Sequence, residues 1–152
     1  MPFAGRITRL KESGTLKILD IVKALQAKGA SIIQLDVGEP DFRTPENVSG
    51  AAKAALDSGF THYTPSAGLP ELRDAVAEKL RLENRLDCRR ENVIITPGSK
   101  QALFYAVMAT VDEGDEVIIP TPAWPSYVEM VTVAGGRVRE VPCRPGFGLD
   151  IE

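Results

Sequence analysis

The sequence predicts an α/β fold built on a mostly parallel β-sheet. Three observations carry that prediction. Short apolar, β-branched runs alternate with helical patterns through the second half of the chain. The junction at 93–102 is the clearest, because such a run ends at Pro97 and Gly98 and a helical pattern follows. With 152 residues, of which 43% are hydrophobic, the chain is long enough for a core. Strands that alternate with helices form βαβ units and a parallel sheet.

The first half of the chain contains three helical patterns and one strand pattern. The expected elements, in order, are an irregular segment over 1–16, a helix over 18–28, a strand over 32–37, a helix over 45–57, a loop over 62–68 and a helix over 69–82. The first helix has one apolar face and ends at Gly29. Thr44 is a good N-cap and Pro45 a good first helical residue for the second. The third is strongly amphipathic.

The second half alternates strands and helices. The expected elements are a strand over 93–95, a helix over 100–111, a strand over 117–119, a helix over 126–133 and a strand over 137–141, with a turn at 112–115. This gives about three parallel strands, few beside the ~5–6 of a typical sheet. We therefore expect the sheet to be incomplete in this chain. Because ligands collect at the carboxyl ends of parallel strands, the loops at 98–100 and 121–124 should lie along one edge.

Charge and composition exclude several classes of protein. The net charge of −3, without a basic cluster, argues against a nucleic-acid partner. Cys88 and Cys143 have no C-x-x-C or histidine pairing, so we expect reduced thiols and no metal site. No apolar run approaches the ~20 residues that span a bilayer, and the N-terminus has no signal core. These features predict a cytoplasmic protein without membrane association.

The segment Gly98, Ser99 and Lys100 carries the most chemical information. It stands where a predicted strand passes into a helix, and the first turn of a helix offers unpaired N–H groups at the positive end of the dipole. This arrangement suits a phosphate. Taken alone, the segment is also compatible with an ordinary strand–helix turn.

Four segments, in this order and spacing, resemble one family. They are Asp36-Val37-Gly38-Glu39-Pro40-Asp41-Phe42 with Thr44-Pro45; His62-Tyr63-Thr64-Pro65-Ser66-Ala67-Gly68 running into Leu69-Pro70-Glu71-Leu72-Arg73; Gly98-Ser99-Lys100-Gln101-Ala102; and Gly114-Asp115-Glu116-Val117 followed by Pro122-Ala123-Trp124-Pro125-Ser126-Tyr127. The chain resembles the N-terminal part of a class I, fold type I, pyridoxal-phosphate-dependent aminotransferase, most like the prokaryotic aspartate aminotransferase subgroup.

The resemblance implies a three-layer α/β/α domain and a cofactor, pyridoxal 5′-phosphate. It assigns 1–45 to an N-terminal arm and small-domain segment, and 46–152 to the first part of the large cofactor-binding domain. Gly98, Ser99 and Lys100 would hold the cofactor phosphate, and Trp124 would stack on the pyridine ring. Tyr63 would reach the phosphate of the neighbouring subunit's cofactor, which implies a homodimer with shared sites.

The same resemblance implies substrate contacts. Gly38 would bring its backbone near the α-carboxylate, and Trp124 would also border the substrate. Ser13, Thr15 and Lys100 would bind the distal carboxylate of an acidic amino acid through charge-assisted hydrogen bonds, which favours aspartate. Each residue also has a structural reading: a turn glycine, a core tryptophan, a loop tyrosine, an N-terminal turn or a solvated lysine. The only histidine, His62, is taken as structural.

No catalytic residue is assigned within the 152 residues. In the family, the Schiff-base lysine lies well downstream of this tryptophan, and Lys100 occupies the phosphate loop instead. The resemblance thus implies a parent enzyme that transfers an amino group from an amino acid, aspartate foremost, to a 2-oxo acid, and a chain that is inactive alone. Two alternatives stay open: another fold type I enzyme of β-lyase or synthase type, or a non-catalytic dimerising remnant.

Overall fold

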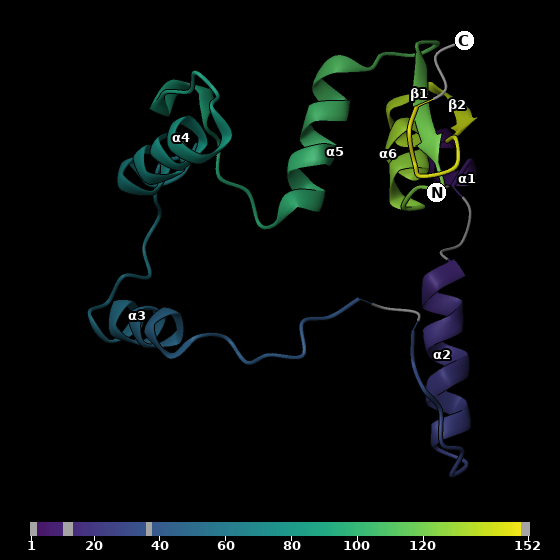
Figure 1. Ribbon diagram of the computed structural model, residues 1–152, viewed down its shortest axis with the longest axis horizontal. Coiled ribbons are helices and arrows are strands. Elements are labelled where there is room, and N and C mark those ends of the chain that lie inside the picture. The colour runs from purple at the N-terminus through teal and green to yellow at the C-terminus, as the bar shows by residue number, and fades with distance from the viewer. Residues whose placement is uncertain (1–2, 11–13, 36–37, 150–152) are drawn as a thin grey trace. The chain divides into compact units, whose positions relative to one another are not determined.

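A computed structural model describes residues 3–10, 14–35 and 38–149 (Figure 1). The elements are α1 (Gly5–Thr8), α2 (Gly14–Gln26), α3 (Glu46–Asp57), α4 (Pro70–Asn84), the 3₁₀ turn η1 (Arg90–Asn92), α5 (Ser99–Thr110), β1 (Glu116–Thr121), α6 (Ser126–Ala134) and β2 (Arg137–Pro142). They form two compact units, one over Glu12–Thr64 and the other over Met1–Lys11 with Pro65–Glu152. The predicted domain boundary at residue 45 stays a prediction.

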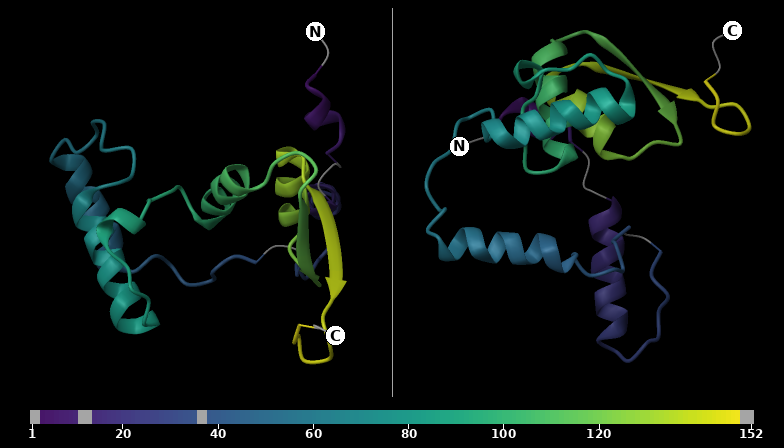
Figure 2. Two further views of the ribbon diagram at one scale, coloured as in Figure 1. Left: turned by 90° about the horizontal axis from the view of Figure 1, so that it is seen from above. Right: turned by 60° about the vertical axis from the view of Figure 1, so that its left-hand side comes forward.

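The centre of the larger unit is the βαβ arrangement of β1, α6 and β2. The strands are parallel and pair from Glu116 with Arg137 through to Thr121 with Pro142. Helix α6 packs on both strands and also contacts α1 and α5 (Figure 2). Its Val131 side chain is only 2% exposed, the lowest exposure in the core. The parallel pairing confirms the predicted sheet type.

Two turns at the same end of β1 and β2 hold this arrangement together. Gly114 donates its N–H to the Gly135 carbonyl at 3.2 Å, and Arg137 donates to the Asp115 carbonyl at 2.7 Å. A Cβ on Gly136 would come within 2.7 Å of a Val111 methyl group. The two turns therefore lie too close together for a residue with a side chain at position 136. The glycines therefore allow the connection before β1 to pack against the connection before β2.

The chain between α4 and α5 is held by a side chain and a close packing contact. Arg73 of α4 donates from Nε to the Val93 carbonyl at 2.8 Å and from Nη2 to the Arg90 carbonyl at 2.7 Å. Ile95 donates its N–H to the Ala67 carbonyl at 3.0 Å. Beside this bond, Gly68 lies so close that a Cβ on it would come within 2.5 Å of Ile95 Cγ1. Helix α4 and its preceding turn thus fix the segment that leads into α5.

Two predicted strands are wrong. Residues 93–95 form no strand, although Val93 is buried, because their backbone groups bond to Arg73 and Ala67 rather than to a parallel neighbour. Residues 32–35 also form none, and Ile33 and Leu35 are almost fully exposed; 36–37 lie outside the described residues. Within 3–10, 14–35 and 38–149 the sheet therefore has two strands instead of about three.

The remaining elements agree with the sequence to within a few residues, with one further correction. The segment 1–16 was expected to be irregular, but α1 forms within it and α2 begins at Gly14 rather than at residue 18. Helices α3, α4, α5 and α6 and strands β1 and β2 are confirmed. As predicted, the sheet is incomplete: Ile118 in the middle of β1 is 67% exposed.

We predict that Gly68→Ala destabilises the larger unit by more than backbone conformation alone explains. Gly68 has φ +102°, and the new methyl group would also collide with Ile95. Gly114→Ala is the matched control, because Gly114 has φ +93° but open space around its Cβ position. Left-handed strain costs roughly 1–2 kcal/mol and overpacking a further roughly 1–3 kcal/mol. Urea unfolding followed by circular dichroism measures both, and equal losses would contradict the packing argument.

Candidate functional site

A pocket of about 230 Å³ opens between the start of α5, the loop after β1 and the start of α6. Its lining residues are Ser99, Lys100, Leu103, Trp124, Ser126, Tyr127 and Met130. The loop at 98–100 and the loop at 121–124 therefore meet at one site, as the sequence predicted. Helix α6, which packs on both strands, and helix α5, which packs on α6, position the two sides of the pocket.

The turn before α5 depends on Gly98. The N–H of Gly98 donates to the Thr96 carbonyl at 2.8 Å, and the Thr96 hydroxyl donates to the Gly98 carbonyl at 2.9 Å. Gly98 has φ +85°, and nothing lies within 4 Å of the position that a Cβ would take. Glycine is therefore required here by the handedness of the backbone rather than by lack of space.

The first turn of α5 presents free N–H groups. Within the described part of the chain, the amides of Ser99, Lys100 and Gln101 have no acceptor. Because α5 extends over 12 residues, these amides also lie at the positive end of a helix dipole. Together with the Ser99 hydroxyl, they make a candidate anion site, with donors of the kind that suit phosphate.

An aromatic ring forms another wall of the pocket. The Lys100 ammonium lies 5.7 Å from the centroid of the Trp124 ring, within the range of a cation–π contact. The indole Nε1–H donates to the Ser126 hydroxyl oxygen at 2.9 Å. Trp124 remains 45% exposed. The pocket therefore combines an anion site, an ammonium group and a partly open aromatic ring.

The other predicted site residues belong to the smaller unit. Tyr63 has a fully exposed side chain, and Gly38 lies in a loop with open space around its Cβ position. Thr15 lies in the first turn of α2, and Ser13 lies outside the described residues. The structure thus brings together Ser99, Lys100 and Trp124, with Gly98 at the turn that leads to them. The roles of all eight residues stay predictions.

Four residues that line the pocket were not among the predicted site residues: Leu103, Ser126, Tyr127 and Met130. Ser126 and Tyr127 lie just after Trp124, inside a segment already matched to the family. A hydroxyl two residues after the tryptophan, at the start of a predicted helix, is the signal that could have identified Ser126. Tyr127 offered only its aromatic character, which is equally typical of a core residue.

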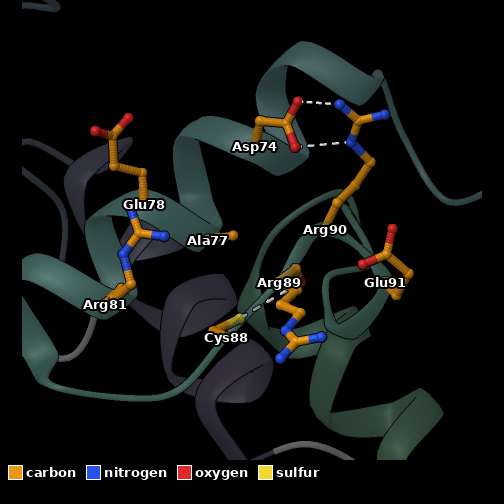
Figure 3. Close-up of a pocket in the computed structure, with 8 residues that line it drawn as sticks. All are labelled: Asp74, Ala77, Glu78, Arg81, Cys88, Arg89, Arg90 and Glu91. Carbon is orange, nitrogen blue, oxygen red and sulfur yellow. Dashed lines mark hydrogen bonds and ion pairs between the residues drawn. The ribbon is translucent and has the colours of Figure 1, made fainter.

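A second hollow, of about 510 Å³, lies between α4 and η1 (Figure 3). Its charged lining residues are three carboxylates and three guanidiniums: Asp74, Glu78, Glu91, Arg81, Arg89 and Arg90. Arg90 binds both carboxylate oxygens of Asp74, from Nε at 2.7 Å and through a second bond from Nη2. Because the charges balance, this hollow lacks the excess positive charge of the pocket at α5.

The ion pair in this hollow shifts the acid–base behaviour of both groups. Hydrogen bonds from Arg90 hold the pKa of the Asp74 carboxyl below its ordinary value of 3.8, and the same pair raises the pKa of Arg90. Since the depressed pKa belongs to the folded state, the pair stabilises the fold above about pH 3.8, and the contribution is lost as pH falls through the folded value. Both side chains are exposed, so the effect is small.

The described residues hold no cluster of histidine, cysteine or carboxylate side chains suited to a metal ion. Cys88 and Cys143 are free, partly exposed thiols. Within the same residues, no helix has the length and apolar character needed to cross a membrane.

The sequence and the fold place the chain among the class I and II aminotransferases. The sequence model of that family matches residues 30–152, which is most of the chain, and the chain belongs to this family. The resemblance inferred from the four segments is thereby confirmed.

Relatives within the family agree. The chain is 45% identical to a probable aspartate/prephenate aminotransferase of Aquifex aeolicus over 98% of this chain and 38% of that protein. It is 48% identical to the aspartate/prephenate aminotransferase of Thermus thermophilus over 95% of this chain and 37% of that protein. The solved aspartate aminotransferase of T. thermophilus with maleate matches with a TM-score of 0.90 and 46% identity over 96% of this chain and 38% of that one. The chain spans about 38% of the length of these relatives.

We predict that the stabilising effect of the Asp74–Arg90 pair disappears in acid. Asp74→Asn should melt slightly below the parent chain near neutral pH, and the difference should shrink as pH falls from about 3.8 through the lower pKa of the folded Asp74 carboxyl. Glu78→Gln is the control, because among the described residues Glu78 forms no ion pair. Thermal melts across this pH range measure the effect. A difference for Asp74→Asn that does not change with pH contradicts it.

Proposed function

We propose that this chain forms the phosphate-binding part of a pyridoxal-5′-phosphate-dependent transaminase, which transfers an amino group from an amino acid, aspartate foremost, to a 2-oxo acid. One observation carries the proposal. The pocket at the start of α5 gathers Ser99, Lys100 and Trp124, three of the residues that the family resemblance assigns to cofactor binding. The rest of the proposal extends from that pocket.

The residues present fit a phosphorylated aromatic cofactor. The free amides of Ser99, Lys100 and Gln101 and the Ser99 hydroxyl would hold the phosphate dianion. The Trp124 ring, partly open to the pocket, offers a flat apolar surface to a heterocycle. When bound, the cofactor supplies an electron sink for the carbon that carries the amino group. The protein's part in this pocket is to bind, orient and exclude water from one side of the ring.

Lys100 supports an acidic substrate. Its ammonium lies over the Trp124 ring in the same pocket, where a carboxylate bound beside the ring could form a charge-assisted hydrogen bond with it. The relatives named above are aspartate or aspartate/prephenate aminotransferases, and one was solved with maleate, itself a dicarboxylate. Ser13 and Thr15 would add hydroxyl donors to the distal carboxylate, and the Gly38 backbone would lie near the α-carboxylate.

Two subunits would share each site. The exposed Tyr63 side chain is available to reach the cofactor phosphate of a second copy, so we propose a homodimer. The covalent cofactor lysine would come from sequence outside these 152 residues. The chain alone would therefore have no general base at the substrate Cα and would not transaminate. We place the enzyme in the cytoplasm.

Cofactor binding is testable on the 152-residue chain itself, because Trp124 is its only tryptophan. Pyridoxamine 5′-phosphate should quench the Trp124 fluorescence, and pyridoxamine, which lacks the phosphate, should do so much less. Ser99→Asp should weaken binding by about ten-fold or more, since hydrogen bonds to charged groups contribute roughly 1.5–3 kcal/mol and the new carboxylate repels the phosphate. Ser58→Asp adds the same charge at an exposed serine and is the control.

That experiment has a clear negative result. If the phosphorylated and unphosphorylated compounds quench equally, or if Ser99→Asp and Ser58→Asp behave alike, the phosphate site is not at the start of α5.

Substrate choice is testable in a longer polypeptide that contains these 152 residues and has the full length of the relatives. Lys100→Ala should lower kcat/KM for aspartate by about ten-fold or more relative to alanine, because one charge-assisted hydrogen bond is lost only for the acidic substrate. Lys79→Ala, an exposed lysine of α4 paired with Glu83, is the control. Equal losses for both substrates contradict the role of Lys100. Release of pyruvate and ammonia from a β-substituted amino acid, without amino-group exchange, contradicts transamination.

A further inference from the structure

The Trp124 indole has a single polar atom, and that atom has a specific partner. Nε1 donates its hydrogen to Oγ of Ser126 at 2.9 Å, and both residues line the pocket at the start of α5. We propose that Ser126 is a positioning residue, which fixes the plane of the Trp124 ring and so sets the aromatic surface that the pocket presents. The functional consequence rests on the cofactor role proposed above for this pocket.

Packing alone does not fix the orientation of the Trp124 ring. Trp124 is 45% exposed, so nearly half of its surface lacks neighbours that would restrict rotation about its side-chain bonds. A directed N–H to oxygen bond restricts that rotation, because hydrogen bonds weaken steeply away from linear geometry. The Ser126 hydroxyl thus supplies the constraint that incomplete burial does not.

The acceptor is attached to a fixed part of the unit. Ser126 is the first residue of α6, and further along this helix Met130 and Val131 are buried against the rest of the unit. The loop before it is closed by a second bond, from the Tyr127 N–H to the Trp124 carbonyl at 3.1 Å. Trp124 is therefore held through both its backbone and its ring by the first turn of the most buried helix.

The same bond engages the only polar atom of the indole. In this structure Ser126 accepts the single indole N–H, so Trp124 presents an aromatic surface to the pocket. Polar donors in the pocket include the Lys100 ammonium and the free amides and hydroxyl at the start of α5. With the ring plane fixed, the Lys100 ammonium, 5.7 Å from the ring centroid, also meets a defined surface.

The test begins without any ligand. As the only tryptophan, Trp124 reports on itself through its emission wavelength, anisotropy and collisional quenching by acrylamide. Ser126→Ala should lower the anisotropy and increase quenching, whereas Ser126→Thr, which keeps the hydroxyl, should restore the parent signals. Valine is nearly the same size as threonine but lacks the hydroxyl. Comparison of Ser126→Val with Ser126→Thr therefore keeps the test decisive if Ser126→Ala folds poorly. Ser58→Ala, an exposed serine elsewhere, should change nothing.

The second stage asks whether Ser126 acts through Trp124. A net hydrogen bond corresponds to a factor of roughly five in an equilibrium, so Ser126→Ala should weaken binding of pyridoxamine 5′-phosphate by about five-fold in equilibrium dialysis. In a Trp124→Phe background, which has no N–H to position, the same change should have no further effect. Additive losses in this double-mutant cycle overturn the proposal.

The two proposals fail separately. If Ser126→Ala and Ser126→Val leave the ligand-free Trp124 signals unchanged, the positioning role is wrong even where the cofactor binds. If those signals change and are restored by Ser126→Thr, but pyridoxamine 5′-phosphate does not bind the parent chain, Ser126 positions the ring and the cofactor assignment is wrong.

Discussion

The burial of α6 against β1 and β2 is the constraint on which the rest of the larger unit depends. Val131 is almost fully buried, and it lies beside the Gly136 turn that lets the two strand connections approach. Because α6 begins directly after the loop that carries Trp124, the packing of this helix also sets the position of the indole. Helix α5, whose first turn offers the free amides, contacts α6 in turn. The shape of the pocket therefore depends on how α6 packs against the two strands and against α5.

The approach to α5 follows a different principle. Residues 93–95 have the apolar pattern of a strand, yet a guanidinium and a loop carbonyl hold them instead of a ladder of backbone bonds. The position of the anion site thus depends on α4, which contributes no residue to the pocket, through Arg73 and the close contact at Gly68. Substitutions in α4 would therefore alter the pocket by shifting the backbone that leads into α5, and not by changing the charge of the pocket.

The sequence predicted the structure correctly where a pattern of residues is compatible with only one arrangement of the backbone. Glu116–Thr121 and Arg137–Pro142 pair as predicted, because β-branched runs separated by one helix have a ready parallel partner in each other. Val93 shows the limit: a pattern predicts that a side chain is buried, but whether the backbone joins a sheet depends on a neighbour that the pattern does not contain. Likewise, residue types and family motifs pointed to Lys100 and Trp124, whereas the bond between Trp124 and Ser126 required the geometry of the turn.

The backbone conformation at Gly98, and not the space around it, limits which residues fit this turn. The Cβ position is open, but φ is +85°. Side chains of the natural configuration are disfavoured at that angle, but residues of mirror-image configuration favour it. Chemical ligation could therefore introduce D-alanine at this position to stiffen the entry to α5 while keeping its backbone path, which no genetically encoded substitution achieves.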